Sequence, residues 1–266
     1  MYNFEYHQAK SVAEASELSL KTEEGKLMAG GMTLIPTLKQ RLAKPSDIID
    51  LGKIAELKGI KKEGNTIVIG AMTRHFDVAY SDIVKSAIPA LAHLAGHIGD
   101  PHVRNRGTMG GSIANSDPAA DYPAGVVALN ATLTTNKRTI KADDFFKGLF
   151  ETALEPGEIL TQVAFNIPDK AWYMKFPNPA SRYAVVGAFV AKFGSEVRVA
   201  ITGAGSYVFR QKAFEAALTK SFTPEAIKDI VQPQDALNSD IHASAEYRAH
   251  LVNVMARRAV AHANTL

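Results

Sequence analysis

The chain has 266 residues, of which 46% are hydrophobic, and its 30 basic and 27 acidic residues leave a net charge of +3 without a nucleic-acid footprint. Cysteine is absent, which excludes disulfides, thiolate metal sites and iron–sulfur ligation by this polypeptide. Neither a signal peptide nor an apolar run of about 18 residues occurs, so we expect a cytoplasmic protein and not an integral membrane protein.

The N-terminal residues predict a small α/β unit, about residues 1–52. Ser11 and Glu14 form a capping box at the start of a helix expected over 11–20. A short buried strand (KLMA), a glycine turn, a short helix (TLKQRL) and a second strand (SDIIDL) follow.

A second unit is expected over residues 53–167. It opens with a hairpin over 57–71 whose turn is Glu63-Gly64-Asn65. Helical spacing of apolar residues follows, and Pro89 is expected to start a fresh helix. The remaining elements expected in this unit are a second glycine-rich turn at 104–124, strands near 126–141 and a strand at 158–167.

The segment PDKAW, residues 168–172, resembles a boundary, after which we expect a domain over 168–266. SRYAVVGAFVAKF and VRVAITGAG predict two strands that a GSE turn joins into an antiparallel hairpin. Helices complete the domain: RQKAFEAALTK, then a helix with Thr223 as N-cap and Pro224 at its first position, then a long helix over about 240–262.

Two glycine pairs, each beside a hydroxyl residue, are the strongest candidates for a binding site. They lie in AGGMT, residues 29–33, and in TMGGS, residues 108–112. Consecutive glycines can adopt positive φ and turn main-chain N–H groups inward as an anion nest, so two such bends suit two linked phosphates. The alternative is that each pair is only a tight turn. Other phosphate motifs fail, because GTMGGS lacks the P-loop lysine and GAGSYV lacks the third glycine of GxGxxG.

The same segments carry a family resemblance. AGGMTLIP and VRNRGTMGGSIANSDPAADYPA resemble the two glycine signatures of the FAD-binding medium subunit of molybdenum hydroxylases, the carbon monoxide dehydrogenase and xanthine dehydrogenase relatives. The similarity covers nearly the whole chain, including LEPGEIL and SRYAVVGAFV. It implies an α+β fold, with a two-subdomain FAD-binding domain of the vanillyl-alcohol-oxidase (PCMH) type at 1–167. A smaller domain of the CO dehydrogenase flavoprotein type, an antiparallel sheet with helices, is implied at 168–266.

The resemblance also implies which residues bind FAD noncovalently. The glycine segments are expected to wrap the diphosphate, and Asp121 to accept hydrogen bonds from ribose hydroxyls. Leu160 and Lys175 match positions that line the flavin or its ribityl chain, while Tyr183 either covers the isoalloxazine ring or is a core or interface residue. The full set of implied cofactor-binding residues is Leu27, Met28, Ala29, Gly30, Gly31, Met32, Thr33, Leu34, Leu94, Thr108, Met109, Gly110, Gly111, Ser112, Asp121, Leu160, Lys175 and Tyr183. We expect no catalytic side chain and no metal ligand on this chain.

Two further groups of residues admit more than one reading. His93 and His97 have the spacing of a metal pair on a helix, but HLAGH lacks the glutamate of HExxH, and packing is the better account. Arg104 and Arg106 could cap helices, meet phosphate or face a partner.

By resemblance, the chain is the FAD-binding electron-transfer subunit of a heterotrimeric molybdenum hydroxylase. It is expected to take electrons from iron–sulfur clusters of a small subunit and to pass them to an external acceptor. Molybdopterin and the two-iron clusters are expected only on partner subunits, the molybdenum on a large one that oxidises the substrate. Two alternatives stay open: a self-contained flavin-dependent oxidase or dehydrogenase acting on a small molecule, and a scaffold that has lost its cofactor.

Overall fold

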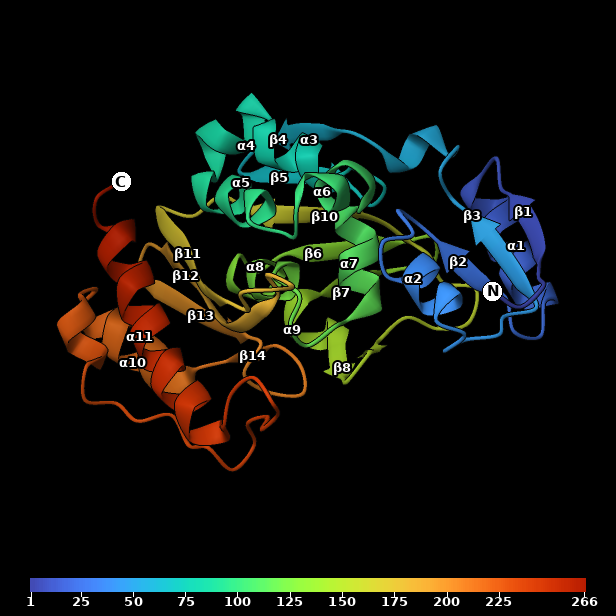
Figure 1. Cartoon of the computed structure of the whole chain (residues 1–266). Helices are drawn as coiled ribbons and strands as arrows, with labels where there is room; N and C mark the ends of the chain where they lie inside the picture. The colour runs from blue at the N-terminus through green and yellow to red at the C-terminus, as the bar shows by residue number, and fades with distance from the viewer.

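The computed structural model describes residues 1–266 and shows three units packed side by side (Figure 1). The N-terminal unit lies at one end, the C-terminal unit at the other, and the second unit between them. None of the helices combines the length and the apolar character needed to cross a membrane.

The N-terminal unit is a three-stranded parallel sheet with two helices. Its elements are β1 (Glu5–Gln8), α1 (Val12–Lys21), β2 (Lys26–Met28), α2 (Leu34–Lys39) and β3 (Asp47–Asp50). The Ser11 cap of α1 is confirmed, since Ser11 Oγ accepts a hydrogen bond from Glu14 N at 3.2 Å. The Glu14 carboxylate accepts from Lys10 N at 2.8 Å, one residue before the position that a capping box requires. The sequence does not predict β1, an edge strand that exposes most of its residues and therefore has no apolar alternation.

The middle unit is built on a five-stranded antiparallel sheet in the order β4-β5-β10-β6-β7. The hairpin with a turn at Gly64 is confirmed, since Glu63 pairs with Thr66 and Gly64 has φ +57°. Pro89 starts a helix, as expected. The elements are η1 (Ala55–Leu57), β4 (Ile60–Glu63), β5 (Thr66–Gly70), α3 (His75–Tyr80), α4 (Asp82–Ala87), α5 (Pro89–Gly96), α6 (Pro101–Arg106), α7 (Met109–Asn115), α8 (Tyr122–Ala128), β6 (Thr132–Thr135), β7 (Thr139–Lys141), α9 (Ala142–Phe145), β8 (Phe146–Gly148), β9 (Glu151–Thr152) and β10 (Leu160–Asn166).

The expectation of a glycine-rich turn over 104–124 is wrong. Most of this stretch is helical, in α6, α7 and the start of α8. Asp100 caps α6 and Thr108 caps α7, each by accepting a hydrogen bond from a backbone N–H three residues on, which starts a helix despite the glycines. The strands expected near 126–141 begin only at Thr132, because α8 extends through Ala128.

The C-terminal unit is a four-stranded antiparallel sheet in the order β11-β12-β13-β14, with helices. The hairpin about Gly194 is confirmed. Thr223 makes no side-chain cap bond, and the short helix after it is of the 3-10 type. The last helix starts later than expected, because Ser244 is its N-cap. The elements are β11 (Lys170–Pro177), β12 (Ala184–Phe193), β13 (Glu196–Thr202), β14 (Phe209–Arg210), α10 (Lys212–Lys220), η2 (Pro224–Ile227) and α11 (Ala245–Ala263).

Strand β12 is buried on both faces, which joins the C-terminal unit to the middle one. Phe189 and Ala191 belong to the main hydrophobic core with α5 and α8, whereas Ala188 and Val190 belong to the core beneath α10 and α11. Side chains alternate between the two faces of a strand, so one strand contributes to two cores. The C-terminal sheet therefore supports the middle unit from one side.

Candidate functional site

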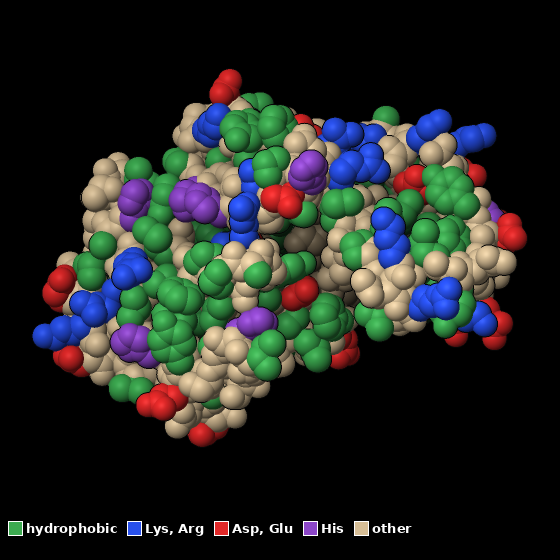
Figure 2. Space-filling view, in the orientation of Figure 1, with side chains coloured by type: hydrophobic (Ala, Val, Ile, Leu, Met, Phe, Trp, Pro, Cys, Tyr) green, Lys and Arg blue, Asp and Glu red, His purple; other side chains and the backbone are tan.

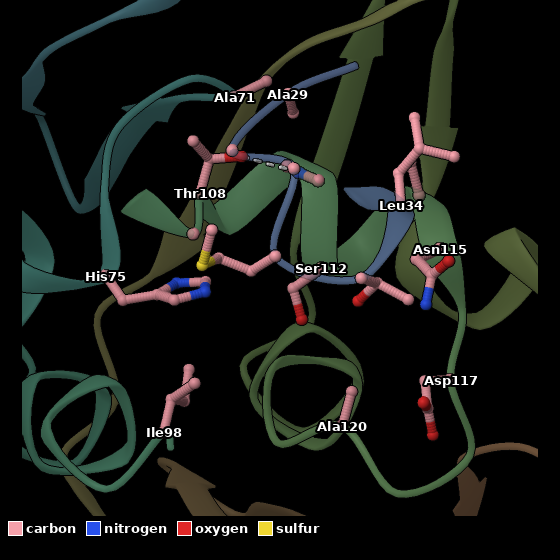
Figure 3. A pocket seen from close by; sticks show the side chains of 18 of the residues that line it. Ala29, Leu34, Ala71, His75, Ile98, Thr108, Ser112, Asn115, Asp117 and Ala120 are labelled. Carbon is pink, nitrogen blue, oxygen red and sulfur yellow. Dashed lines mark hydrogen bonds between the residues drawn. The ribbon is translucent and has the colours of Figure 1, made fainter. Parts of the chain in front are cut away.

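A cavity lies where the N-terminal unit meets the middle unit. Its volume is about 550 Å³, within the range of about 300–1,000 Å³ that is typical of ligand and cofactor sites. Its walls come from the β2–α2 loop, α7 and the start of β10, and the loop between β11 and β12 reaches its mouth. Figure 2 shows the surface hollowed at this junction, and Figure 3 shows side chains that line the cavity.

Most of the residues that the family resemblance implies line this one cavity. They come from all three units and from positions up to 156 residues apart in the chain, Leu27 to Tyr183. Those that line it are Leu27, Ala29, Gly30, Gly31, Met32, Thr33, Leu34, Thr108, Gly110, Gly111, Ser112, Asp121, Leu160 and Tyr183.

The other four implied residues lie behind the cavity wall. Leu94 and Met109 are fully buried in the main core. Met28 packs beneath the first glycine loop, with its Sδ 3.6 Å from where a Cβ on Gly31 would lie. The Lys175 side chain is only 6% exposed and contacts Asp121. Ile98, one turn beyond Leu94, does line the cavity, and the sequence reasoning missed it.

The first glycine segment is a loop with free main-chain donors. Gly31 is buried and has φ +74°, a conformation that favours glycine. Its carbonyl accepts a hydrogen bond from Ile35 N at 2.9 Å, but the N–H groups of Gly30 to Thr33 donate to no acceptor in the chain. Gly31 is buried, Gly30 and Met32 are half-buried and Thr33 is exposed. Main-chain N–H groups that line a cavity without an acceptor in the chain are suited to an anionic ligand.

The second glycine segment is the first turn of α7 and not an anion nest. Met109 N donates to Thr73 O at 2.9 Å, and Gly110 N donates to Ala71 O at 2.8 Å. Gly111 N donates to Thr108 Oγ1 at 3.1 Å, the dashed line in Figure 3. These amides are already satisfied within the chain. The cavity instead receives the Ser112 side chain, which points into it (Figure 3).

The glycines allow the two segments to pack backbone against backbone. A Cβ on Gly30 would lie 2.1 Å from Arg106 O, and a Cβ on Gly110 would lie 2.4 Å from Ala71 Cβ. A Cβ on Gly111 would lie 3.0 Å from Ala29 Cβ. Larger residues would separate the first loop from the α6–α7 bend, so close approach is the main physical reason for glycine here.

Asp121 joins the cavity to the C-terminal sheet. Lys175 Nζ lies 3.0 Å from Asp121 Oδ1 and also donates to His97 O at 2.8 Å, and the Tyr173 hydroxyl donates to Asp121 Oδ1. Burial raises the pKa of Asp121, while the charge of Lys175 and the hydrogen bond from Tyr173 act in the opposite direction. Each carboxylate oxygen has two lone pairs, so acceptor capacity remains for a ligand hydroxyl.

The segment before α8 is fixed by the C-terminal domain. Thr202 Oγ1 donates to Ala120 O at 2.6 Å, and Gly203 N donates to Pro118 O at 2.7 Å. Asp117 and Asp121 flank these contacts and both line the cavity. The sequence reasoning missed Asp117, because it assigned a role only to Asp121 among the residues of the quoted DPAAD segment.

Glu158 is a further residue of the wall that the sequence reasoning missed. Its buried carboxylate accepts hydrogen bonds from Thr135 Oγ1 at 2.7 Å and Arg138 Nε at 2.9 Å. The hydrogen bond from Arg138 is the main cause that lowers the pKa of Glu158 to about 2. This carboxylate is therefore occupied inside the protein and fixes the start of β10 beside Leu160.

Tyr183 lies at the cavity mouth and is not a core residue. It is 44% exposed and follows a turn in which Asn178 Oδ1 accepts hydrogen bonds from Ala180 N and Ser181 N. Burial and the nearby charge of Asp117 raise the pKa of the Tyr183 phenol. The ring is therefore a neutral aromatic surface beside the opening.

None of the residues in the two ambiguous groups, His93, His97, Arg104 and Arg106, lines the cavity. The His93 and His97 rings are 4.0 Å apart, and His93 stacks on Trp172 at 4.4 Å. No cluster of three or more His, Asp or Glu side chains is arranged to hold a metal ion. Arg104 acts as a cap after α5, since Arg104 Nη1 donates to Ile98 O at 3.0 Å.

Two family models match the chain and together cover almost all of it. The model described as "FAD binding domain in molybdopterin dehydrogenase" matches residues 2–169. The model described as "CO dehydrogenase flavoprotein C-terminal domain" matches residues 171–263.

Known proteins resemble the chain over its whole length. It is 37% identical to the carbon monoxide dehydrogenase medium chain of Hydrogenophaga pseudoflava, over 97% of this chain and 96% of that one. It is also 37% identical to the glyceraldehyde dehydrogenase medium chain of Sulfolobus acidocaldarius, over 96% of each. A chain in the structure of reconstituted CO dehydrogenase from Oligotropha carboxidovorans matches with a TM-score of 0.90 and 32% identity, over 99% of this chain and 98% of that one.

Proposed function

The chain belongs to the family of FAD-binding medium subunits of molybdopterin dehydrogenases, and from this premise we propose that it works as the flavoprotein subunit of a heterotrimeric molybdenum hydroxylase. In this role it holds FAD noncovalently between an iron–sulfur small subunit, from which electrons arrive, and an external acceptor. A large subunit carries the molybdopterin and oxidises the substrate. We further propose a cytoplasmic location for this complex.

The observation that best supports FAD binding is the cavity bounded by both glycine segments. Its size suits a cofactor, and its first loop presents the unpartnered N–H groups of Gly30 to Thr33. Such donors stabilise a diphosphate without a lysine. The residues present therefore fit the cofactor that the family implies.

We propose separate roles for the groups around the cavity. The Gly30–Thr33 amides and the Ser112 hydroxyl hold the diphosphate, and Asp121 accepts from a sugar hydroxyl. Leu160 and Ile98 exclude water from the apolar part of the cofactor, and Tyr183 covers its exposed ring at the mouth. Lys175, Met28, Leu94 and Met109 support these residues from behind. When bound, FAD supplies a carrier that exchanges one or two electrons, and this chain contributes position and electrostatics.

A self-contained flavin oxidase is the weaker alternative. The relatives are chains of larger complexes, named as a medium chain, a medium subunit or an FAD subunit. A scaffold without cofactor is also disfavoured, because it would have no use for a cavity of this size lined by unpartnered main-chain donors.

Purification separates the three possibilities. We expect the chain to bind an equimolar amount of FAD that acid precipitation releases intact, as a noncovalent cofactor requires. We expect an organic substrate to reduce this flavin only when the molybdenum and iron–sulfur subunits are present. Reduction by a substrate with the isolated chain would support the oxidase, and a chain that neither retains nor rebinds FAD would support the scaffold.

A further inference from the structure

His75 is a buried histidine in the cavity wall that no motif identifies. It is the first residue of α3, is 4% exposed and lines the cavity, and Figure 3 shows its ring extending from α3 into that space. Its Nδ1 is buried without a hydrogen-bond partner. This ring is therefore a polar group that the protein leaves unsatisfied beside a ligand-sized cavity.

The surroundings of His75 keep it neutral. Burial, and then the positive charge of Arg104, lower the pKa of His75 to about 4. The ring lies 5.4 Å from that of Tyr122, whose hydroxyl is also buried without a partner. A neutral imidazole has one N–H donor and one nitrogen acceptor, so it can bond either a phosphate oxygen or a hydroxyl.

Two nearby polar side chains, that of Thr108 in the same wall and that of Thr73 just before His75, have partners within the chain. Thr73 Oγ1 lies 3.1 Å from both Gly59 N and Gly59 O, and Thr108 Oγ1 accepts from Gly111 N. An unsatisfied buried polar group costs free energy, and a hydrocarbon ring in place of the imidazole would avoid this cost. Where a sequence breaks such a rule, a functional reason is expected.

We propose that His75 is a cofactor-binding residue, whose Nε2, the ring nitrogen that is not enclosed by the protein, makes a hydrogen bond to an oxygen of FAD. The inference rests on the proposed function, since it takes FAD to be the ligand of this cavity. It adds a residue that lies outside both glycine segments and outside the family signatures quoted above.

The test compares FAD binding to flavin-free wild-type protein and to His75→Phe, by fluorescence titration. We expect the variant to bind FAD about tenfold more weakly, which corresponds to ~1.4 kcal/mol. Without FAD, the variant should unfold at the same or a higher temperature than the wild type, because it buries no unsatisfied nitrogen. A merely structural histidine would instead give a less stable flavin-free protein.

His93→Phe is the matched control. The pKa of His93 is also lowered to about 4, mainly by burial, but His93 stacks on Trp172 and does not line the cavity. Its FAD affinity should equal that of the wild type.

A second measurement does not depend on any variant. The 15N NMR shifts of the His75 ring in the wild type should move when FAD is added, as a new hydrogen bond requires. Unchanged ring shifts, or equal FAD affinity in His75→Phe and wild type, would overturn the inference and leave FAD binding itself intact. If the wild type bound no FAD, the proposed function would fail instead.

Discussion

Replacing Gly30 by alanine tests whether close backbone packing shapes the cofactor site. The added Cβ would lie 2.1 Å from Arg106 O and 2.7 Å from Gly107 Cα, whereas ordinary contact begins at 3.4 Å. Both neighbours are backbone atoms, which no rotamer change can move away. The first loop and the α6–α7 bend must therefore separate by at least about 1.3 Å, the difference between 3.4 and 2.1 Å.

This separation has two measurable costs. Overpacking of this kind destabilises a protein by about 1–3 kcal/mol. In a chain of about this length, a loss of ~2 kcal/mol lowers the melting temperature by roughly 4–8 °C. Displacing the Gly30–Thr33 amides from the diphosphate also weakens hydrogen bonds to a charged group, each of which contributes about 1.5–3 kcal/mol. We expect the FAD affinity of Gly30→Ala to fall by at least about tenfold.

Fluorescence titration with FAD and thermal unfolding measure these two effects. The control is Gly64→Ala, at the tip of the β4–β5 hairpin, where φ is +57° and no atom lies within 4 Å of the added Cβ. A left-handed alanine costs about 1–2 kcal/mol, so the control loses comparable stability away from the cavity. If Gly30→Ala bound FAD as tightly as Gly64→Ala, the proposed role of the glycine packing would be refuted.

Two further predictions concern buried charges. In Glu158→Gln, Arg138 loses its buried partner, and we expect about 2 kcal/mol less stability at pH 7. Because the pKa of Glu158 is lowered to about 2, the stability deficit of the variant is complete above about pH 4.5 and shrinks as the pH falls toward 2. Urea unfolding at several pH values measures this deficit. A deficit that does not change with pH would contradict the ion pair between Glu158 and Arg138. In Lys175→Met, Asp121 becomes a buried carboxylate without its cation, at a cost of about 3–5 kcal/mol at neutral pH. The pKa of Asp121 then rises further, so the variant should lose less stability relative to the wild type at pH 5 than at pH 8. Thermal unfolding at both pH values measures this, and a larger loss at pH 5 would show that Asp121 is not held by this ion pair.

The strands with strong apolar patterns could be predicted from the sequence. SRYAVVGAFVAKF and VRVAITGAG are β-rich runs about a glycine turn, and they form β12 and β13 as expected. Strand β1 was missed because an exposed edge strand needs no apolar alternation. The pattern of apolar residues therefore predicts a strand only where the strand buries those residues.

The second glycine segment was misread because its glycines serve tertiary packing. Gly110 and Gly111 suggest a turn when only their own conformational freedom is considered, but their φ angles are not positive and Thr108 caps a helix there. A Cβ on Gly110 would meet Ala71, which is distant in sequence, and a Cβ on Gly111 would meet both the capping Thr108 Oγ1 at 2.7 Å and the distant Ala29 Cβ at 3.0 Å. Propensity alone could not reveal these contacts.

The residues of the candidate site also divide into those that the sequence reveals and those that only the fold reveals. The glycine segments and Asp121 could be found through a family resemblance, because they form long motifs. His75 belongs to no motif, whereas Asp117 and Glu158 lie within the quoted family segments but had no role assigned to them, and only the folded chain brings all three to one cavity. Their environment, not their sequence context, gives His75 and Glu158 shifted pKa values.

A crystal structure of the chain with FAD bound tests the central claim most directly. We predict the diphosphate against the N–H groups of Gly30 to Thr33, with Met109 N and Gly110 N still donating to Thr73 O and Ala71 O. Cofactor density elsewhere in the molecule, or a diphosphate held by the amides of an unwound α7, would contradict it.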